Sequence, residues 1–416
     1  MRKILFPVLA AFMLAGFYSA AVTKKVLFIG NSYTYTNNMP SIVDSIARAL
    51  GDTIIYDVSA PGGHTLQQHC TNATTIAKIF SQQWDIVVIH EQSQMPSFPP
   101  AQVATDVYPY AHILDSMVHA NDSCTQTMFM MTWGHANGDP MNCPGYPVIC
   151  TFDGMQMRLR ESYLQMAIDN HADVIPVGSA FKIMVDSAYT PWLFMGDSSH
   201  PVVPGSYLEA CVIYSSIYHK NTQNCTYTDG LTTTDAHLLQ RIATKVVFDS
   251  LNLWQGTGQY PYAGFTHSGT SPVIFSHHSP VYGSHYWSYG DGNHDTAANP
   301  SHIYATGGYH VVMHTVTTTC FTETMTDTVF TTAGINENAK PDNAMLVMQQ
   351  GNGMVTFQLM GTGYSVLEIF DSKGSLVKKY NAPSQQFADK FVPGLYIYRL
   401  YNNTNTAFSV GKMSIW

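Results

Sequence analysis

The chain has 416 residues, 45% of them hydrophobic and 11% charged, and this length exceeds one ordinary hydrophobic core, so two or three domains are expected. The formal net charge is -9, from 19 Lys and Arg against 28 Asp and Glu. Because the balance is acidic and the sequence contains no basic stripe, nucleic acid is excluded as an expected partner.

The first 21 residues are expected to be a signal peptide. Arg2 and Lys3 precede an apolar stretch, Ile4–Phe17, and the small residues at 19–21 fit a cleavage site. The apolar stretch is short for a membrane span, and an uncleaved anchor is the alternative. We therefore expect a secreted or cell-surface protein that has no membrane span once the signal is removed.

Short apolar runs alternate with helical patterns between residues 22 and 260. The expected strands are Val26–Ile29, Thr53–Val58, Asp85–His90, Thr127–Thr132 and Asp173–Val177. The expected helices lie near Pro40–Leu50, Leu66–Ser81, Ala101–His119, Gln156–Asn170, Pro204–His219 and Thr234–Leu253. This alternation predicts an α/β domain with a parallel sheet between helical layers, which binds its ligand at the carboxyl ends of the strands.

A serine and a distant Asp-x-x-His pattern carry the expected chemistry. Ser32 follows the first strand, and Asp197 and His200 lie late in the same domain. A hydroxyl becomes a good nucleophile when an imidazole takes its proton and a carboxylate orients that imidazole. We predict that Ser32 is the nucleophile, His200 the base and Asp197 the orienting group. The alternative is that Ser32 caps a helix and that the other two belong to an ordinary loop.

Acyl transfer also needs donors for the developing oxyanion. The expected donors are the backbone N–H of Ser32, a backbone N–H near Gly62-Gly63, and a side-chain amide after the third strand. Glycine suits the second position because it has no Cβ to keep a ligand away from the backbone.

Three segments together resemble the SGNH (GDSL-like) hydrolases. Gly30-Asn31-Ser32-Tyr33 is similar to the first block of that family, with Asn31 in place of the usual Asp. Ala60-Pro61-Gly62-Gly63-His64-Thr65 resembles the second block, and 197–201 the last. The resemblance covers about residues 24–253. It implies a three-layer α/β/α flavodoxin-like fold, the catalytic roles given above, and an oxyanion-hole N–H at Gly63.

The third block departs from the family pattern Gly-x-Asn-Asp. Here the strand runs into His90-Glu91-Gln92-Ser93-Gln94, and counting forward from Asp85 without a gap puts Gln94 at the asparagine. A glutamine amide donates the same kind of hydrogen bond with a longer reach. We therefore predict Gln94 as the side-chain donor of the oxyanion hole, with Gln92 as the alternative.

Other polar and aromatic residues near the strand ends are weaker candidates for substrate contact. A lone histidine is more often hydrogen-bonded within the protein or at its surface, and an aromatic residue beside a strand end is usually part of the core. These candidates are His64, His90, His135, Trp133 and Tyr33.

Seven cysteines in an exported chain allow disulfides and leave at least one thiol unpaired within the molecule. Cys143 and Cys150 close a short loop and are the best-supported pair. Pairing of Cys211 with Cys225 is weaker, because Cys211 falls in an apolar helical pattern. No Cys or His spacing predicts a zinc site.

The region 268–332 resembles a PKD-type β-sandwich. Its marks are the segment Trp287–Gly292 followed by Asn299–Tyr304. Such modules are spacers or polysaccharide-associated binders. Asp291 begins a segment similar to a calcium loop, but Thr296 and His302 stand where that loop needs Gly and Glu. A hairpin turn is therefore expected, and no metal.

The region 338–416 resembles a type IX secretion sorting domain. The resemblance rests on the opening Pro341-Asp342-Asn343, the segment Val366–Gly374, the segment Pro393–Tyr398 and a terminal strand at Lys412–Trp416. It implies the type IX secretion machinery as a partner. A plain β-sandwich binding domain is the alternative.

Together these features predict a secreted serine esterase that needs no cofactor. The expected substrate is a small-molecule or polysaccharide ester, above all an acetyl ester of a carbohydrate, on the strength of the resemblances. One alternative is a non-catalytic carbohydrate-binding or adhesion protein on the same fold, which the altered third block favours. The other is a lipase or thioesterase, which would need a large exposed apolar lid that the sequence does not suggest.

Overall fold

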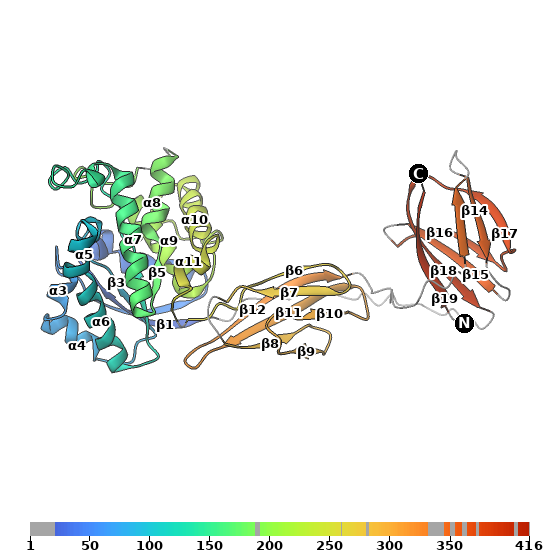
Figure 1. The fold of residues 1–416 in the computed structure, drawn as a ribbon, viewed down its shortest axis with the longest axis horizontal. Helices are drawn as coiled ribbons and strands as arrows, with labels where there is room; N and C mark the ends of the chain where they lie inside the picture. The colour runs from blue at the N-terminus through green and yellow to red at the C-terminus, as the bar shows by residue number, and fades with distance from the viewer. Residues whose placement is uncertain are drawn as a thin grey trace, which may run out of the picture.

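The computed structural model describes residues 21–187, 192–258, 260–279, 283–331, 345–349, 354–359, 364–371, 374–402 and 407–415. Figure 1 shows them gathered into one α/β body and two all-β bodies further along the chain. The expected signal segment up to residue 20, the opening Pro341-Asp342-Asn343 of the C-terminal region and Trp416 lie outside the described residues.

A five-stranded parallel sheet forms the centre of the α/β body. The spatial order is β2-β1-β3-β4-β5, which is the flavodoxin-like order. The predicted fold class is confirmed, and each expected strand forms near its expected bounds. The strands are β1 (Thr23–Ile29), β2 (Thr53–Ser59), β3 (Ile86–Ile89), β4 (Gln126–Met130) and β5 (Asp173–Ile175).

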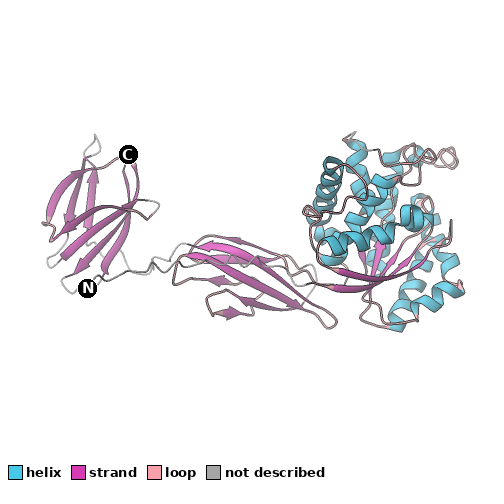
Figure 2. Cartoon of the chain, turned by 180° about the vertical axis from the view of Figure 1, so that it is seen from behind, coloured by secondary structure: helices cyan, strands magenta, loops and turns pink. Residues whose placement is uncertain are grey.

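Helices cover both faces of this sheet, as Figure 2 shows in cyan. Successive residues of a strand point to opposite faces, so β1 supplies Val26 and Phe28 to one core and Leu27 and Ile29 to the other. On the first face pack α2 (Met39–Ala49), α8 (Val177–Asp186), α9 (Val203–Tyr218) and α10 (Thr233–Phe248). On the second pack α3 (Leu66–His69), α4 (Ala73–Ile79), α5 (Pro100–Asp106), α6 (Tyr108–Asn121) and α7 (Phe152–Asn170).

Three expected helices are interrupted, and α8 was not expected. The helix predicted at 66–81 restarts at Asn72, whose side chain accepts hydrogen bonds from the N–H groups of Thr74 and Thr75. The helix predicted at 101–119 divides near Pro109, which cannot donate a helical hydrogen bond. The helix predicted at 234–253 divides before α11 (Leu251–Gln255).

The short 3-10 helices are η1 (Thr36–Asn38), η2 (Met95–Ser97) and η3 (Pro147–Cys150).

The region that resembles a PKD module consists of two antiparallel sheets packed around Trp287, Phe275 and Tyr289. The Asp291 carboxylate accepts a hydrogen bond from Asn293 N–H and lies 2.7 Å from His302 Nε2. These contacts are typical of a turn. One sheet contains β6 (Phe265–Ser268), β7 (Val273–His277) and β10 (Ser301–His302). The other contains β8 (Ser284–Ser288), β9 (His294–Asp295), β11 (Gly308–Thr317) and β12 (Thr322–Thr331).

The C-terminal region likewise forms two antiparallel sheets, with Leu367, Ile369 and Phe357 in its core. The expected terminal strand is the end of a longer strand, which begins at Ala407. One sheet contains β13 (Met345–Gln349), β14 (Met354–Leu359) and β17 (Gln386–Lys390). The other contains β15 (Tyr364–Asp371), β16 (Leu376–Asn381), β18 (Gly394–Asn402) and β19 (Ala407–Ile415).

The tip of the β11–β12 hairpin is fastened to the α/β body. Cys320 forms a disulfide with Cys124, which lies 196 residues earlier in the loop before β4. Beside it, the Glu323 carboxylate lies 2.9 Å from the buried His219 imidazole and accepts a hydrogen bond from Ala263 N–H. This cross-link was not predicted, because nothing in the spacing of the cysteines relates residues so far apart.

The other cysteines follow the expectations more closely. Cys143 and Cys150 form the predicted disulfide. Cys211 and Cys225 are buried free thiols, so the weaker pairing is not formed, and Cys70 is also free. Within the part of the chain that is described, no helix has the length and apolar character needed to cross a membrane.

Candidate active site

Ser32 lies where β1 leaves the sheet. Gly30 ends the strand against His90, and a Cβ there would fall 2.0 Å from His90 Nε2, so only glycine fits. The short helix α1 (Ser32–Tyr35) then begins, and its cap is Asn31, whose side chain accepts a hydrogen bond from Tyr33 N–H. Ser32 is therefore not the capping residue, and its hydroxyl is free to face the carboxyl edge of the sheet.

The three residues predicted as a triad are joined by hydrogen bonds. His200 Nε2 lies 2.8 Å from Ser32 Oγ, and His200 Nδ1 lies 2.6 Å from Asp197 Oδ2. Burial opposes ionisation of Asp197, but hydrogen bonds from the N–H of Ser199 and from His200 outweigh it and lower the carboxyl pKa. A carboxylate that stays ionised can orient the imidazole and stabilise its protonated form, as proton transfer from a serine requires.

The loop that carries Asp197 and His200 is held by the loop after β4. Trp133 Nε1–H donates to the Ser199 carbonyl at 2.9 Å, and Ala136 N–H donates to the Ser198 carbonyl at 2.8 Å. The Trp133 ring is fully buried and stacks between Tyr33 and Phe181 at centroid distances of 4.4 and 4.2 Å. Trp133 therefore supports the site from the core and does not face the cavity.

The loops that would supply the oxyanion donors are tied together by two buried polar side chains. Asn31 Nδ2 donates to the His64 carbonyl at 3.2 Å and to the Glu91 carbonyl at 3.3 Å. The Glu91 carboxylate accepts hydrogen bonds from Leu66 N–H and Gln92 N–H. Burial raises the Glu91 pKa to about 7, although those two hydrogen bonds favour the ionised form. Sequence reasoning missed Glu91, whose role depends on partners in two other loops.

Gly63 and both glutamines line the cavity beside Ser32. Gly63 has a φ of 69°, in the left-handed region that favours glycine. Gln94 Nε2 donates to Asp139 Oδ2 at 2.8 Å, so its amide is already engaged. Gln92 Nε2 has only long contacts, 3.3 Å to Gln94 Oε1 and 3.5 Å to Ser93 Oγ. This geometry favours Gln92, the alternative, over Gln94 as the amide donor.

The three histidines considered from the sequence lie in different places. His90 is buried behind the site, bonds Thr34 Oγ1 at 2.7 Å, and has its pKa lowered to about 4 by burial. His64 contacts Asn72 and does not line the cavity. His135 does line it, together with Ser93 and Ser199, which the sequence analysis did not single out.

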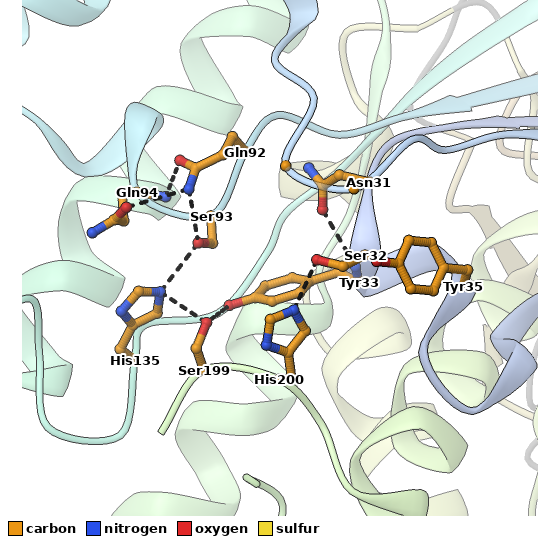
Figure 3. A pocket seen from close by; sticks show the side chains of 12 residues that line it. Asn31, Ser32, Tyr33, Tyr35, Gln92, Ser93, Gln94, His135, Ser199 and His200 are labelled. Carbon is orange, nitrogen blue, oxygen red and sulfur yellow. Dashed lines mark hydrogen bonds between the residues drawn. The ribbon is translucent and has the colours of Figure 1, made fainter. Parts of the chain in front are cut away.

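The cavity in front of Ser32 has a volume of about 430 Å³. Figure 3 shows Ser32 and His200 on one side and Gln92, Ser93 and His135 on the other. Twelve described residues line it, and none of them is aliphatic, Lys or Arg. Of its two tyrosines, Tyr35 is exposed, whereas Tyr33 is buried against Trp133. Among the described residues of the chain, no group of three or more His, Cys, Asp or Glu side chains fits a metal ion.

Comparison with known proteins finds no matching family model and no matching curated protein. Solved structures do match. A DUF4886 family protein from Bacteroides uniformis is 18% identical over 55% of this chain and 96% of its own, with a TM-score of 0.45. A lipase/acylhydrolase from Enterococcus faecalis is 15% identical over 47% of this chain and 96% of its own, with a TM-score of 0.36. The PKD1 domain of Vibrio anguillarum Epp is 28% identical over 18% of this chain and 98% of its own, with a TM-score of 0.17.

Proposed function

We propose that this chain is a secreted serine esterase. The observation that carries the proposal is the continuous hydrogen-bonded path from Asp197 through His200 to Ser32 Oγ at the wall of a cavity. In the reaction, Ser32 Oγ attacks the ester carbonyl while His200 takes its proton and Asp197 stabilises the imidazolium. His200 then protonates the leaving alcohol, and water releases the acyl group from Ser32 by the same steps.

The developing oxyanion is stabilised by the N–H groups of Ser32 and Gly63 and by an amide of the third loop. Gln92 fits this last role because its amide has only long contacts, whereas Gln94 is held by Asp139. Glu91 and Asn31 fix the two loops that carry these donors. A preorganised set of donors accounts for a large part of the rate in acyl transfer.

The substrate we propose is a short acyl ester, above all an acetyl ester, of a carbohydrate. A lipase or thioesterase surrounds its acyl chain with apolar side chains, and the twelve described residues that line this cavity include no aliphatic one. Polar walls with the exposed Tyr35 ring suit a sugar, which has both hydroxyl groups and apolar ring faces. Non-catalytic carbohydrate binding is the second candidate, because Gln94 stands at the expected asparagine and its amide is turned to Asp139.

We also propose that the chain is exported and acts outside the cell or at its surface. The two disulfides support export, because such bonds persist in oxidising compartments. Delivery by type IX secretion machinery rests on the C-terminal resemblance alone. Transport of a fluorescent protein placed between residues 1–21 and 338–416, in a bacterium with and without that machinery, tests this part.

The hydrolase proposal is tested by a serine substitution in the full chain without its signal. Ser32→Ala should lower kcat on p-nitrophenyl acetate at least 1,000-fold and abolish labelling by a serine-reactive phosphonate, whereas Ser81→Ala, at an exposed serine, should do neither. If the parent protein binds saccharides but hydrolyses no ester, the second candidate is favoured. Turnover that rises with acyl chain length would favour a lipase.

A further inference from the structure

One wall of the cavity is a cluster of hydroxyl groups around a second imidazole. Ser93 follows β3, His135 follows β4, and Ser199 lies between Asp197 and His200, so three loops meet here. His135 Nε2 lies 3.1 Å from Ser93 Oγ and 3.1 Å from Ser199 Oγ. In Figure 3 the Tyr33 ring extends from beside Ser32 toward this cluster, and its hydroxyl lies 2.7 Å from Ser199 Oγ.

The cluster has more hydrogen-bonding capacity than its members can use among themselves. Nε2 of a neutral imidazole offers either one proton or one lone pair, whereas each serine hydroxyl offers one proton and two lone pairs. His135 therefore bonds fully with only one of the two serine oxygens, which are equally distant from it. The Gln92 side-chain amide, with Nε2 3.5 Å from Ser93 Oγ, adds little.

The charge of the cluster points to a neutral ligand group. Burial lowers the pKa of His135 and His200 adds to the effect, against the opposing influence of Asp139 and Asp197. A neutral imidazole can either donate to a hydroxyl or accept from one, depending on its tautomer. No Lys or Arg is among the twelve described lining residues, so an anionic group would find no partner charge there.

We propose that Ser93, His135 and Ser199 form a subsite for a hydroxyl group of the substrate alcohol, beside the ester that Ser32 attacks. This inference rests on the proposed function, and it narrows the substrate to a partly acylated sugar that keeps a free hydroxyl near the ester. Because an acetyl group has no hydroxyl, the hydroxyl that binds in this subsite belongs to the sugar. A fully acylated sugar or a simple alkyl ester leaves the subsite unpaired, which costs affinity in the transition state.

Two substrates that differ only at the free hydroxyls test the subsite. One is a mono-O-acetyl methyl xyloside, and the other is the same monoacetate with its remaining hydroxyls methylated. The parent protein should prefer the first at least tenfold in kcat/KM. In His135→Leu and in Ser93→Ala this preference should fall at least fivefold, and His135→Gln, which keeps a donor and an acceptor, should restore part of it.

The preference, rather than the rate, separates the subsite from a structural role. A substitution that only disturbs the neighbouring His200 loop lowers the rates on both monoacetates together and leaves their ratio unchanged. An unchanged ratio in His135→Leu and Ser93→Ala would therefore overturn the proposal. A parent protein that hydrolyses both monoacetates equally would also overturn it while leaving the esterase intact. Failure of the proposed function looks different, because the parent then hydrolyses neither monoacetate nor p-nitrophenyl acetate.

Discussion

The disulfide between Cys124 and Cys320 should contribute more to stability than the other disulfide of this chain. It closes a loop with a sequence separation of 196, whereas Cys143 and Cys150 are separated by 7. In the chain-entropy model, closing a loop of that length lowers the entropy of the unfolded chain enough to stabilise the fold by about 5 kcal/mol, against about 2.5 kcal/mol for the short loop. The prediction is therefore the order of the two losses: removing the long-range disulfide costs more stability than removing the short one.

The perturbation is Cys124→Ser with Cys320→Ser, and Cys143→Ser with Cys150→Ser is the matched control. Both pairs remove one disulfide and add two hydroxyls, but only the first pair releases the β11–β12 hairpin from the α/β body. Urea unfolding is followed by tryptophan fluorescence, and the free energy of unfolding of the α/β body is compared among the three proteins under oxidising conditions. Dithiothreitol should lower the parent to the stability of a protein that lacks both cross-links.

An equal or smaller loss for the long-range pair would refute the reasoning. That result would mean that the unfolded chain keeps the hairpin near the α/β body without the bond, or that the other contacts of the hairpin hold it fully. The contact of Glu323 with the buried His219 is one of these.

Four further substitutions test the electrostatic and catalytic arguments. Glu323→Gln should cost about 3 kcal/mol, because it leaves the buried His219 without its anion. Burial lowers the His219 pKa, but Glu323, Gln255 and Asp173 together raise it. The loss should therefore be largest below pH 6.5 and fade as the pH rises through the folded pKa, as urea unfolding at pH 5 and 9 will show. Burial raises the Glu209 pKa well above 4.5, so this acid destabilises the fold increasingly above that pH. The stability of Glu209→Gln relative to the parent should therefore rise between pH 4 and 7, by up to about 1.4 kcal/mol per pH unit. A stability difference that does not change with pH would contradict the buried neutral acid. Gln92→Ala should lower kcat on p-nitrophenyl acetate about 100-fold and Gln94→Ala much less, and the reverse order would restore Gln94 as the oxyanion donor.

The fold was predictable because its signals are local. Each strand of the sheet is a short apolar run, and a strand buried on both faces needs no partner-specific pattern. Helix α8 was missed because its apolar start continues directly from the run that forms β5. The breaks near Asn72 and Pro109 depend on a capping side chain and on a missing N–H, which the overall periodicity hides.

The candidate site was only half predictable, for a related reason. Ser32, Asp197 and His200 stand in segments whose residue types carry the chemistry, and the fold brings them within hydrogen-bonding distance. The choice between Gln92 and Gln94 depends on Asp139, which approaches from another loop. Counting along the sequence cannot detect that contact. For the same reason, it cannot show that two serines share a contact with His135.

The expected boundary at residue 260 cuts through contacts that the α/β body uses. A fragment that ends there keeps Cys124 and His219 but loses Cys320 and Glu323. Phe321, which lies edge-on to the Tyr260 ring at 5.1 Å, is lost with them. The buried imidazole would then lack its anion and the thiol its partner, although nothing at the carboxyl edge of the sheet has changed. Low activity of such a fragment would therefore report on this missing support rather than on the Ser32 chemistry, and the catalytic tests belong on the full chain.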